Sequence, residues 1–185
     1  PEKNFERMNN SNRRLCIPEI DPKEFTEYII EALKIEKDWI PKEEGKSLYI
    51  RPMIIATDEN LGVHASKTYQ FICIFCPVAS YYQSGIEPVK IYVEHDFKRA
   101  VKGGTGFAKT AANYAQSLKS QEEAEEAGYA QVLWLDAIER KYIEEVGSMN
   151  IMFVIDGTVV TPELNGSILP GITRASALEL LRDKG

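Results

Sequence analysis

A lysine with small neighbours follows a glycine-rich loop in the second half of the chain. Lys109 comes directly after the segment 102–108 (KGGTGFA), which holds three glycines, and it is followed by Thr110 and two alanines. Glycines let a backbone approach a bound molecule closely, and a lysine amine with room beside it can form an imine with a carbonyl compound. Taken alone, the stretch favours a solvated lysine at the start of a helix. It is not a nucleotide-binding P-loop, because the GxxxxGK(S/T) spacing is absent.

A pair of carboxylates and a predicted helix start are the other groups that could do chemistry. Glu144 and Glu145 are neighbours, and if they lie in a strand their side chains point to opposite faces, so only one of them can face a given site. Further on, the Pro-Gly dipeptide at 170–171 opens a predicted helix, and the amides of Ile172 and Thr173 lie at its positive end. Free N–H groups and the helix dipole let such an end bind phosphate, although an ordinary helix start is the commoner case.

Composition and charge narrow the class of protein. The net charge of −6, with lysine and arginine scattered along 185 residues, argues against nucleic acid as a partner, since phosphate backbones need clustered basic side chains. No apolar run reaches the roughly 20 residues that span a bilayer. Three cysteines without secretory features suggest reduced thiols and a cytoplasmic protein.

The cysteines and histidines do not form a metal-binding pattern. Cys73 and Cys76 formally give a CxxC motif, but in a strand this spacing directs them to opposite faces, and we expect two buried thiols. His64 and His95 each stand alone. The sequence therefore predicts no metal site.

The elements that would position these groups alternate between helices and strands. The predicted helices lie at residues 4–14, from 22 onward, at 109–127 and from about 172 onward. The predicted strands lie at 47–56, 68–79, 89–94, 131–136, 150–155 and 158–161. Asp21 is expected to cap the second helix, an Asp-Gly turn at 156–157 predicts a hairpin, and the apolar run 68–79 is expected to be central in its sheet. The fold class is predicted to be α/β.

Five segments together resemble one family, in the family's order. These are segments 47–52 (SLYIRP), 76–81 (CPVASY), 103–114 (GGTGFAKTAANY), 145–150 (EVGSMN) and 164–174 (LNGSILPGITR). They are similar to segments of the branched-chain amino-acid aminotransferases, which belong to the fold-type IV enzymes that depend on pyridoxal 5′-phosphate (PLP). The resemblance covers essentially the whole chain. It departs from the family at 111–112, where two alanines stand in place of common glycines, and at Ser148, where threonine is common.

The resemblance implies a role for each residue that would bind the cofactor. Lys109 matches the lysine that carries PLP as a Schiff base and moves a proton during the reaction. Tyr114 matches the tyrosine that hydrogen-bonds the phenolic oxygen of PLP, and because it is five residues further on, Lys109 is expected at the edge of the helix. Glu145 matches the carboxylate at the pyridine nitrogen. The phosphate would be held by Arg7 and by the amides of Ile172 and Thr173.

Substrate contacts are also implied by the resemblance alone. Tyr49 and Arg51 match residues beside the substrate carboxylate, and their period-two spacing fits one face of a strand. Ser148 keeps the hydroxyl of the family's threonine. For the others, ordinary packing is an equally good interpretation: Tyr81, Leu61 and Val63, the last two in a loop that in the family reaches the neighbouring subunit of a homodimer.

The implied fold is that of the fold-type IV enzymes, with a small α/β N-terminal domain at 1–82, a linker at 83–88 and part of the PLP-binding domain at 89–185. The implied reaction is transamination of leucine, isoleucine and valine with 2-oxoglutarate. Because the family extends beyond both ends of this chain, we expect a fragment of the whole enzyme. The alternatives are a D-amino-acid aminotransferase, an aminodeoxychorismate lyase, or a catalytically silent piece.

Overall fold

The computed structural model describes residues 1–79 and 87–184, and the chain divides into two compact units, Pro1–Glu87 and Pro88–Gly185. Both helices and strands occur in each unit, so the prediction of an α/β fold is confirmed. The predicted linker at 83–88 falls mostly outside the described residues. Within the described part, none of the helices combines the length and apolar character needed to cross a membrane.

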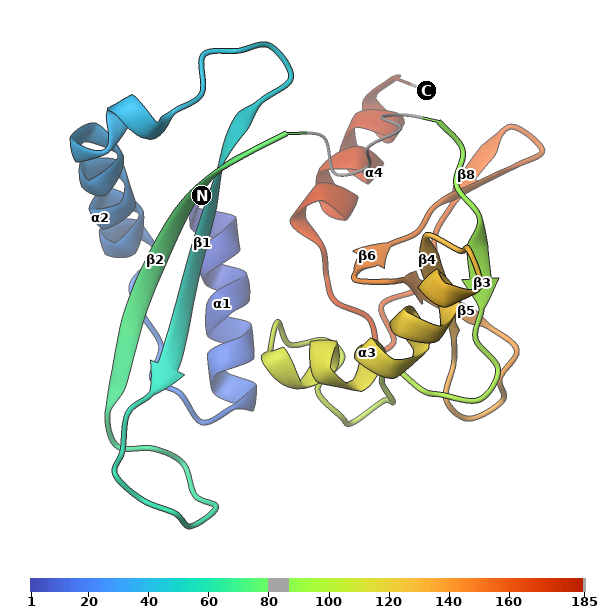
Figure 1. Ribbon diagram of the computed structural model, residues 1–185, viewed down its shortest axis with the longest axis horizontal. Helices are drawn as coiled ribbons and strands as arrows, with labels where there is room; N and C mark the ends of the chain where they lie inside the picture. The colour runs from blue at the N-terminus through green and yellow to red at the C-terminus, as the bar shows by residue number, and fades with distance from the viewer. Residues whose placement is uncertain (80–86, 185) are drawn as a thin grey trace. The chain divides into compact units, whose positions relative to one another are not determined.

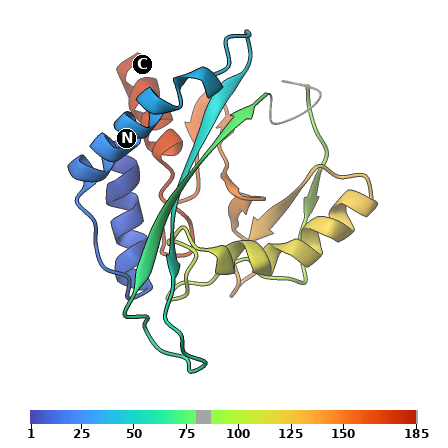
Figure 2. The same cartoon turned by 60° about the vertical axis from the view of Figure 1, so that its left-hand side comes forward.

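The first unit is a long hairpin with two helices against it (Figures 1 and 2). Phe5, Phe25 and Phe71 bring the three parts together, with ring centroids 4.8 Å apart between Phe25 and Phe71 and 6.2 Å apart between Phe5 and Phe25. The strands pair antiparallel from Ser47 opposite Val78 to Ala56 opposite Tyr69. Its elements are α1 (Glu2–Arg14), α2 (Pro22–Ile35), the short 3-10 helix η1 (Lys37–Trp39), β1 (Ser47–Ala56) and β2 (Tyr69–Val78).

The second unit holds a four-stranded mixed sheet covered by a long helix. The strands run in the order β3-β4-β5-β6, with β3 parallel to β4 and the other pairs antiparallel. Ala124 packs against Val132 and Trp134 to form the core under the helix α3. The four strands are β3 (Ile91–Val93), β4 (Gln131–Leu135), β5 (Ile143–Val146) and β6 (Met149–Asn150), and the covering helix is α3 (Ala111–Glu126).

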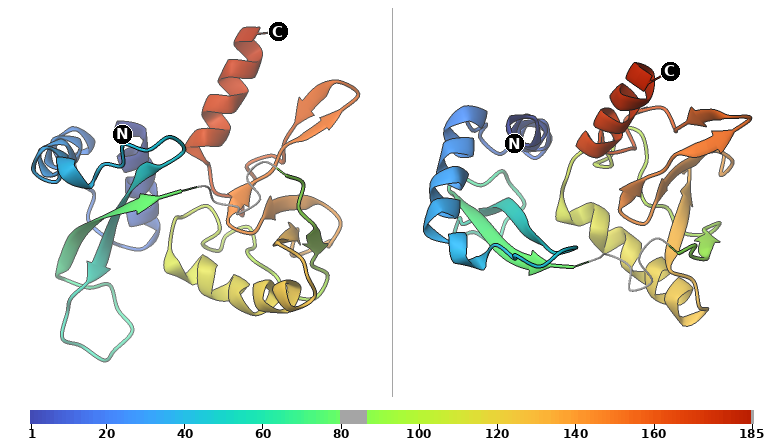
Figure 3. Two further views of the ribbon diagram at one scale, coloured as in Figure 1. Left: turned by 45° about the horizontal axis from the view of Figure 1, so that its top comes forward. Right: turned by 90° about the horizontal axis from the view of Figure 1, so that it is seen from above.

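A separate hairpin and a last helix complete this unit. β7 (Phe153–Ile155) and β8 (Thr158–Val160) form a two-stranded sheet of their own, drawn in orange away from α3 in Figure 3. Asp156 and Gly157 have φ values of 50° and 77°, which a two-residue hairpin turn requires, so the predicted Asp-Gly turn is confirmed. The helix α4 (Ile172–Lys184) begins where the Pro-Gly dipeptide predicted it.

Three predictions concern the first unit, and one of them is confirmed while two are wrong. Asp21 caps α2 as predicted, because its Oδ1 accepts hydrogen bonds from the amides of Lys23 at 2.8 Å and Glu24 at 3.1 Å. The prediction that 68–79 is a central strand is wrong for the described residues, since β2 pairs with β1 alone. The expectation of buried thiols also fails, because Cys73 is half-buried and Cys76 is exposed. A long apolar run is typical of a strand that is buried on both faces. In the first unit, however, β2 belongs to a sheet of two strands.

Candidate active site

Lys109 lies just before the helix α3. Thr110, in an extended conformation with φ −126°, precedes the first helical residue, so Lys109 is at the helix edge as predicted. The Lys109 Nζ atom donates a hydrogen bond to the Tyr114 Oη atom at 2.9 Å. Both side chains are exposed on the unit to which they belong. The amine and the phenol that the resemblance assigns to the same cofactor are therefore in direct contact.

The glycine-rich loop before Lys109 is fastened to α3 by a buried asparagine. The Asn113 Nδ2 atom donates to the carbonyls of Thr105 at 2.9 Å and Ala108 at 2.7 Å, and Thr105 Oγ1 donates to Asn113 Oδ1 at 2.8 Å. Gly106 lets this loop approach a second one closely, because a Cβ atom at Gly106 would lie 2.0 Å from the Ser167 carbonyl oxygen. The backbone on both sides of Lys109 is thus fixed by contacts that leave its side chain uncovered.

Glu145 is buried on β5, and its two oxygens have three partners. The Oε1 atom accepts hydrogen bonds from Asn150 Nδ2 at 3.0 Å and from the Leu169 amide at 3.1 Å. The Oε2 atom lies 2.9 Å from Arg99 Nη2 in an ion pair that is buried at both ends. Burial raises the pKa of Glu145 from its ordinary value of 4.5 to about 7, although Arg99, the Leu169 amide and Lys109 each act to lower it. Glu145 therefore titrates near neutral pH.

The turn before α4 is tied to the same carboxylate. Asn150 Nδ2 also donates to the Leu169 carbonyl at 3.0 Å, so one amide group links Glu145 to the segment that leads into the helix. The first hydrogen bond of α4 runs from the Ala175 amide to the Gly171 carbonyl at 3.0 Å. The amides of Ile172 and Thr173 belong to the first turn, where the helix itself supplies no acceptor.

Four of the residues singled out in the sequence line one small cavity of about 30 Å³: Lys109, Tyr114, Glu145 and Ser148. The volume is too small to enclose a pyridoxal ring. Because Lys109 and Tyr114 are exposed, this cavity is open to the surface of the second unit, and it is called the depression below. Ile172 and Thr173 follow Leu169, which lines the same cavity, but they do not line it themselves.

The remaining candidate residues lie in the first unit. Tyr49 and Arg51 occupy one face of β1, where Arg51 Nη2 lies 3.5 Å from Tyr49 Oη and the guanidinium carbon lies 5.2 Å from the ring centroid. Their predicted shared face is confirmed. Arg7 is half-buried on α1, while Leu61 and Val63 are fully exposed on the loop between β1 and β2. Tyr81 lies outside the described residues.

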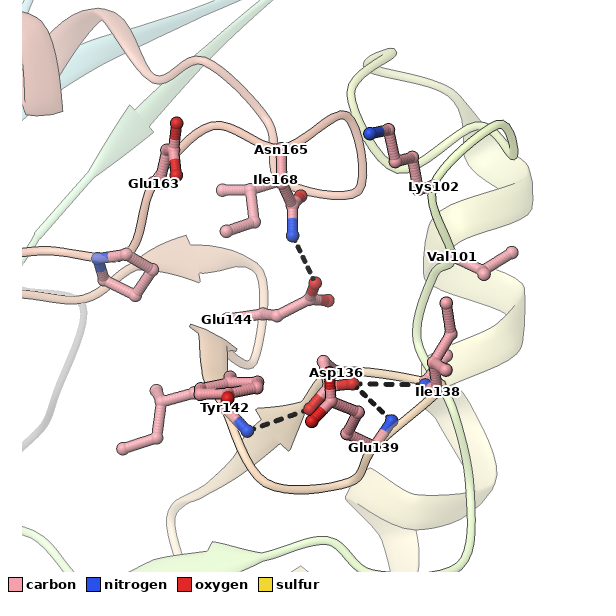
Figure 4. Close-up of a pocket in the computed structure, with 13 residues that line it drawn as sticks. Val101, Lys102, Asp136, Ile138, Glu139, Tyr142, Glu144, Glu163, Asn165 and Ile168 are labelled. Atoms are coloured by element: carbon pink, nitrogen blue, oxygen red, sulfur yellow. Dashed lines mark hydrogen bonds between the residues drawn. The ribbon is translucent and has the colours of Figure 1, made fainter.

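The larger cavity of the second unit lies on the other face of β5. Its volume is about 470 Å³, and Figure 4 shows the Glu144 carboxyl group among its lining side chains. Glu144 Oε1 accepts hydrogen bonds from Asn165 Nδ2 at 3.2 Å and from Ser167 Oγ. Neither Lys109 nor Tyr114 borders this cavity. The predicted opposite orientation of Glu144 and Glu145 is thus confirmed.

Sequence reasoning missed three residues that build the site: Arg99, Asn113 and Asn150. Asn113 and Asn150 lie inside segments that resemble the family, and this location could have identified them as candidates. No feature of the sequence could have identified Arg99, because it is one of many scattered basic residues. Within residues 1–79 and 87–184, no cluster of three or more His, Cys, Asp or Glu side chains could hold a metal ion.

Comparison with known proteins assigns the chain to a family. The chain is 64% identical over 185 residues to branched-chain-amino-acid aminotransferase 2 of Bacillus subtilis (strain 168), covering 100% of this chain and 51% of that protein. The crystal structure of the Escherichia coli branched-chain amino acid aminotransferase has a TM-score of 0.83 at 27% identity, covering 100% of this chain and 59% of that one. A further branched-chain amino acid aminotransferase with this fold was crystallised with pyridoxamine 5′-phosphate.

A putative 4-amino-4-deoxychorismate lyase from Legionella pneumophila has a TM-score of 0.80 at 20% identity over 97% of this chain and 62% of that one, which shows a shared fold alone. The chain spans about half the length of the B. subtilis relative. The family model described as amino-transferase class IV matches residues 1–185. By its sequence and its fold, the chain belongs to the class IV aminotransferases.

Proposed function

We propose that the whole protein is a PLP-dependent transaminase that moves the amino group of leucine, isoleucine or valine to 2-oxoglutarate. The observation that carries this proposal is the contact of Lys109 with Tyr114 at the same small cavity that the buried carboxylate of Glu145 lines. An amine, a phenol and a buried anion are the three groups that the aldehyde, phenolic oxygen and pyridine nitrogen of PLP need as partners. Two relatives that are 64% and 57% identical to the chain bear branched-chain aminotransferase names.

When bound, PLP supplies an electron sink for the bond to the substrate Cα atom. Lys109 would hold the cofactor aldehyde through its amine, and the same amine would carry the proton at the substrate Cα atom. Tyr114 would donate a hydrogen bond to the phenolic oxygen of PLP. Glu145 would face the pyridine nitrogen and, when ionised, would favour its protonated form, which strengthens the electron sink.

Further residues are proposed to bind the phosphate group of PLP and the substrate. Arg7 offers a planar guanidinium group for the phosphate oxygens, and the Ile172 and Thr173 amides offer the positive end of α4. The proposed substrate contacts are Tyr49, Arg51, Tyr81, Ser148, Leu61 and Val63.

The proposed organisation is a small domain at 1–82, a linker at 83–88 and the first part of the PLP domain at 89–185. We further propose a cytoplasmic homodimer that binds neither nucleic acid nor membrane. Leu61 and Val63 support the dimer, because two large apolar side chains are left fully exposed on one loop. The net charge of −6 supports the absence of a nucleic-acid partner.

The direct test uses the whole protein purified with PLP. Borohydride reduction should fix the cofactor to the peptide that contains Lys109, as peptide mass mapping would report, and Lys109→Ala should lose the visible absorbance of bound PLP. Transamination should fall by at least roughly 10²- to 10⁴-fold, the range for removing an acid–base group. Lys102→Ala is the matched control, because it changes an exposed lysine of the same loop. A cofactor adduct on another peptide would refute the proposal.

A substrate panel separates the enzymes that share this fold. Leucine and valine should be the best amino donors, while D-alanine and aminodeoxychorismate should react slowly or not at all. Preference for D-alanine or for aminodeoxychorismate would instead assign the protein to a D-amino-acid aminotransferase or a lyase.

A further inference from the structure

Arg99 is a buried cation that contacts two separate parts of the second unit. Its side chain is 6% exposed, and its Nη2 atom lies 2.9 Å from Glu145 Oε2 and 2.5 Å from the Ser167 carbonyl oxygen. The carbonyl of Ser167 is in turn held against Gly106 in the loop before Lys109. The guanidinium group is therefore fixed in place by a backbone acceptor before any cofactor is present.

The charged groups whose electrostatic effect reaches Glu145 come from three segments, and one of them, Glu144, points to the opposite face of β5. Arg99 approaches from the segment after β3, Lys109 from the start of α3, and Glu144 from the neighbouring position on β5. The turn before α4 contributes only the neutral Leu169 amide, and β6 contributes the neutral Asn150 side chain. Among these groups, Arg99 opposes the effect of burial most strongly. An ionised carboxyl group is costly to bury unless a countercharge accompanies it.

We propose that Arg99 is a positioning residue that acts through Glu145, favouring the ionised form of its carboxyl group and aiming it at the depression that holds Lys109. This inference rests on the proposed function, in which the pyridine nitrogen of PLP meets Glu145. Asn150 and the Leu169 amide donate hydrogen bonds to Oε1, while Arg99 forms an ion pair with Oε2. Both oxygens of the carboxylate are therefore held in place. A purely structural arginine would brace the Ser167 loop and leave the ionisation of Glu145 unchanged.

The first experiment needs no cofactor. Carbon-13 NMR of the glutamate carboxyl groups, assigned with Glu145→Gln, follows the titration of Glu145 in the apo-protein. Arg99→Met should raise the pKa of Glu145 by about one unit or more, since a contacting opposite charge has an effect of that size. Arg99→Lys keeps the charge and should leave most of the wild-type titration. Arg182→Met, which removes an exposed arginine of α4, should leave the titration unchanged.

The second experiment measures PLP affinity of the whole protein against pH. Arg99→Met should weaken PLP binding at least tenfold at neutral pH, and the loss should shrink at higher pH, where Glu145 ionises without help. An equal loss at every pH would indicate a structural role and overturn the proposal. If the wild-type protein bound no PLP, the proposed function would fail, while the apo-protein titration would still decide the role of Arg99.

If Arg99→Met does not fold, a double substitution still tests the proposal. Arg99→Met leaves an uncompensated buried carboxylate, whereas Arg99→Met with Glu145→Gln removes both charges together. The double variant should recover a cooperative melting transition that the single variant lacks. If the double variant is as unstable as Arg99→Met alone, then the lost Ser167 contact is the cause and Arg99 does not act through Glu145. An unchanged Glu145 titration in a folded Arg99 variant would overturn the proposal equally.

Discussion

The two faces of β5 carry neighbouring carboxyl groups that are buried to a similar extent and have different surroundings. Glu144 is 4% exposed and Glu145 is 3% exposed. Glu145 faces a buried arginine, two N–H donors and the depression that holds Lys109. Glu144 faces the larger cavity, and two neutral donors share its Oε1 atom. Its buried Oε2 atom has no hydrogen-bond partner among the residues that the structure describes.

Neither burial nor cavity size therefore distinguishes Glu145, the carboxylate proposed to act in the reaction, from Glu144. The larger cavity, of about 470 Å³, lies beside Glu144, and the paired amine and phenol of Lys109 and Tyr114 do not border it. What distinguishes Glu145 is its set of partners, above all a fixed positive charge in direct contact. Ser167 connects the two faces, because its hydroxyl donates to Glu144 while its carbonyl accepts from Arg99.

The sharpest way to break this comparison is to neutralise each carboxyl group in turn in the whole protein. Glu145→Gln should lower kcat of transamination by roughly 10²- to 10³-fold, the usual effect of removing one preorganised electrostatic partner, because a neutral amide cannot keep a pyridine nitrogen protonated. Glu144→Gln preserves the side-chain shape on the opposite face and should change kcat by only a few fold. Steady-state kinetics with leucine would check both variants. Equal losses in the two would remove the distinction between the faces.

Local patterns in the sequence predicted those features that depend on a few consecutive residues. The period of two along a strand separated Glu144 from Glu145. Asp21 before Pro22 predicted a helix cap, and the Asp-Gly pair predicted a hairpin turn. The family-like segment around Lys109, with a tyrosine five positions further on, placed an amine at the edge of a helix, where it meets the phenol.

Features that depend on distant parts of the chain were not predictable. Arg99 meets Glu145 only because β4 and β5 pair and because the Ser167 loop returns beside the glycine-rich loop, and no local pattern reports such a meeting. Asn150 was visible inside a family-like segment, yet its bond to the Leu169 carbonyl appears only in three dimensions. The wrong expectation for 68–79 has a related cause, since apolar content does not reveal how many strands join a sheet.

The pH dependence of stability offers a second test of the comparison. Folding raises the pKa of Glu145 from 4.5 to about 7, so between these values the folded chain binds a proton that the unfolded chain has lost. The contribution of Glu145 is therefore fully present below about pH 4.5 and is lost as the pH rises through 7. A shift of this size corresponds to at most about 3 kcal/mol.

Urea unfolding at pH 4.5, 6 and 8 would measure this contribution as the difference between wild type and Glu145→Gln. The wild-type free energy of unfolding should fall relative to that of the variant as the pH rises. Glu144→Gln, on the opposite face, is the comparison variant and should change the slope less, because it keeps the buried Glu145 carboxyl group and removes only one of the smaller influences on its pKa. A slope that Glu145→Gln leaves intact would mean that another group titrates in this range.

The smallest expected effect concerns Ser167, which has a role on each face. Ser167→Ala removes the hydroxyl donor to Glu144 but keeps the backbone carbonyl that accepts from Arg99. A buried carboxyl group that loses one neutral donor should cost about 1–2 kcal/mol in the free energy of unfolding, while Asn165 continues to donate. Because the Arg99 contact survives, the titration of Glu145 should stay at its wild-type position. Ser176→Ala, an exposed serine on α4, is the control for stability. A shift in the Glu145 titration in Ser167→Ala would show that the two faces of β5 are coupled through this residue and do not act independently.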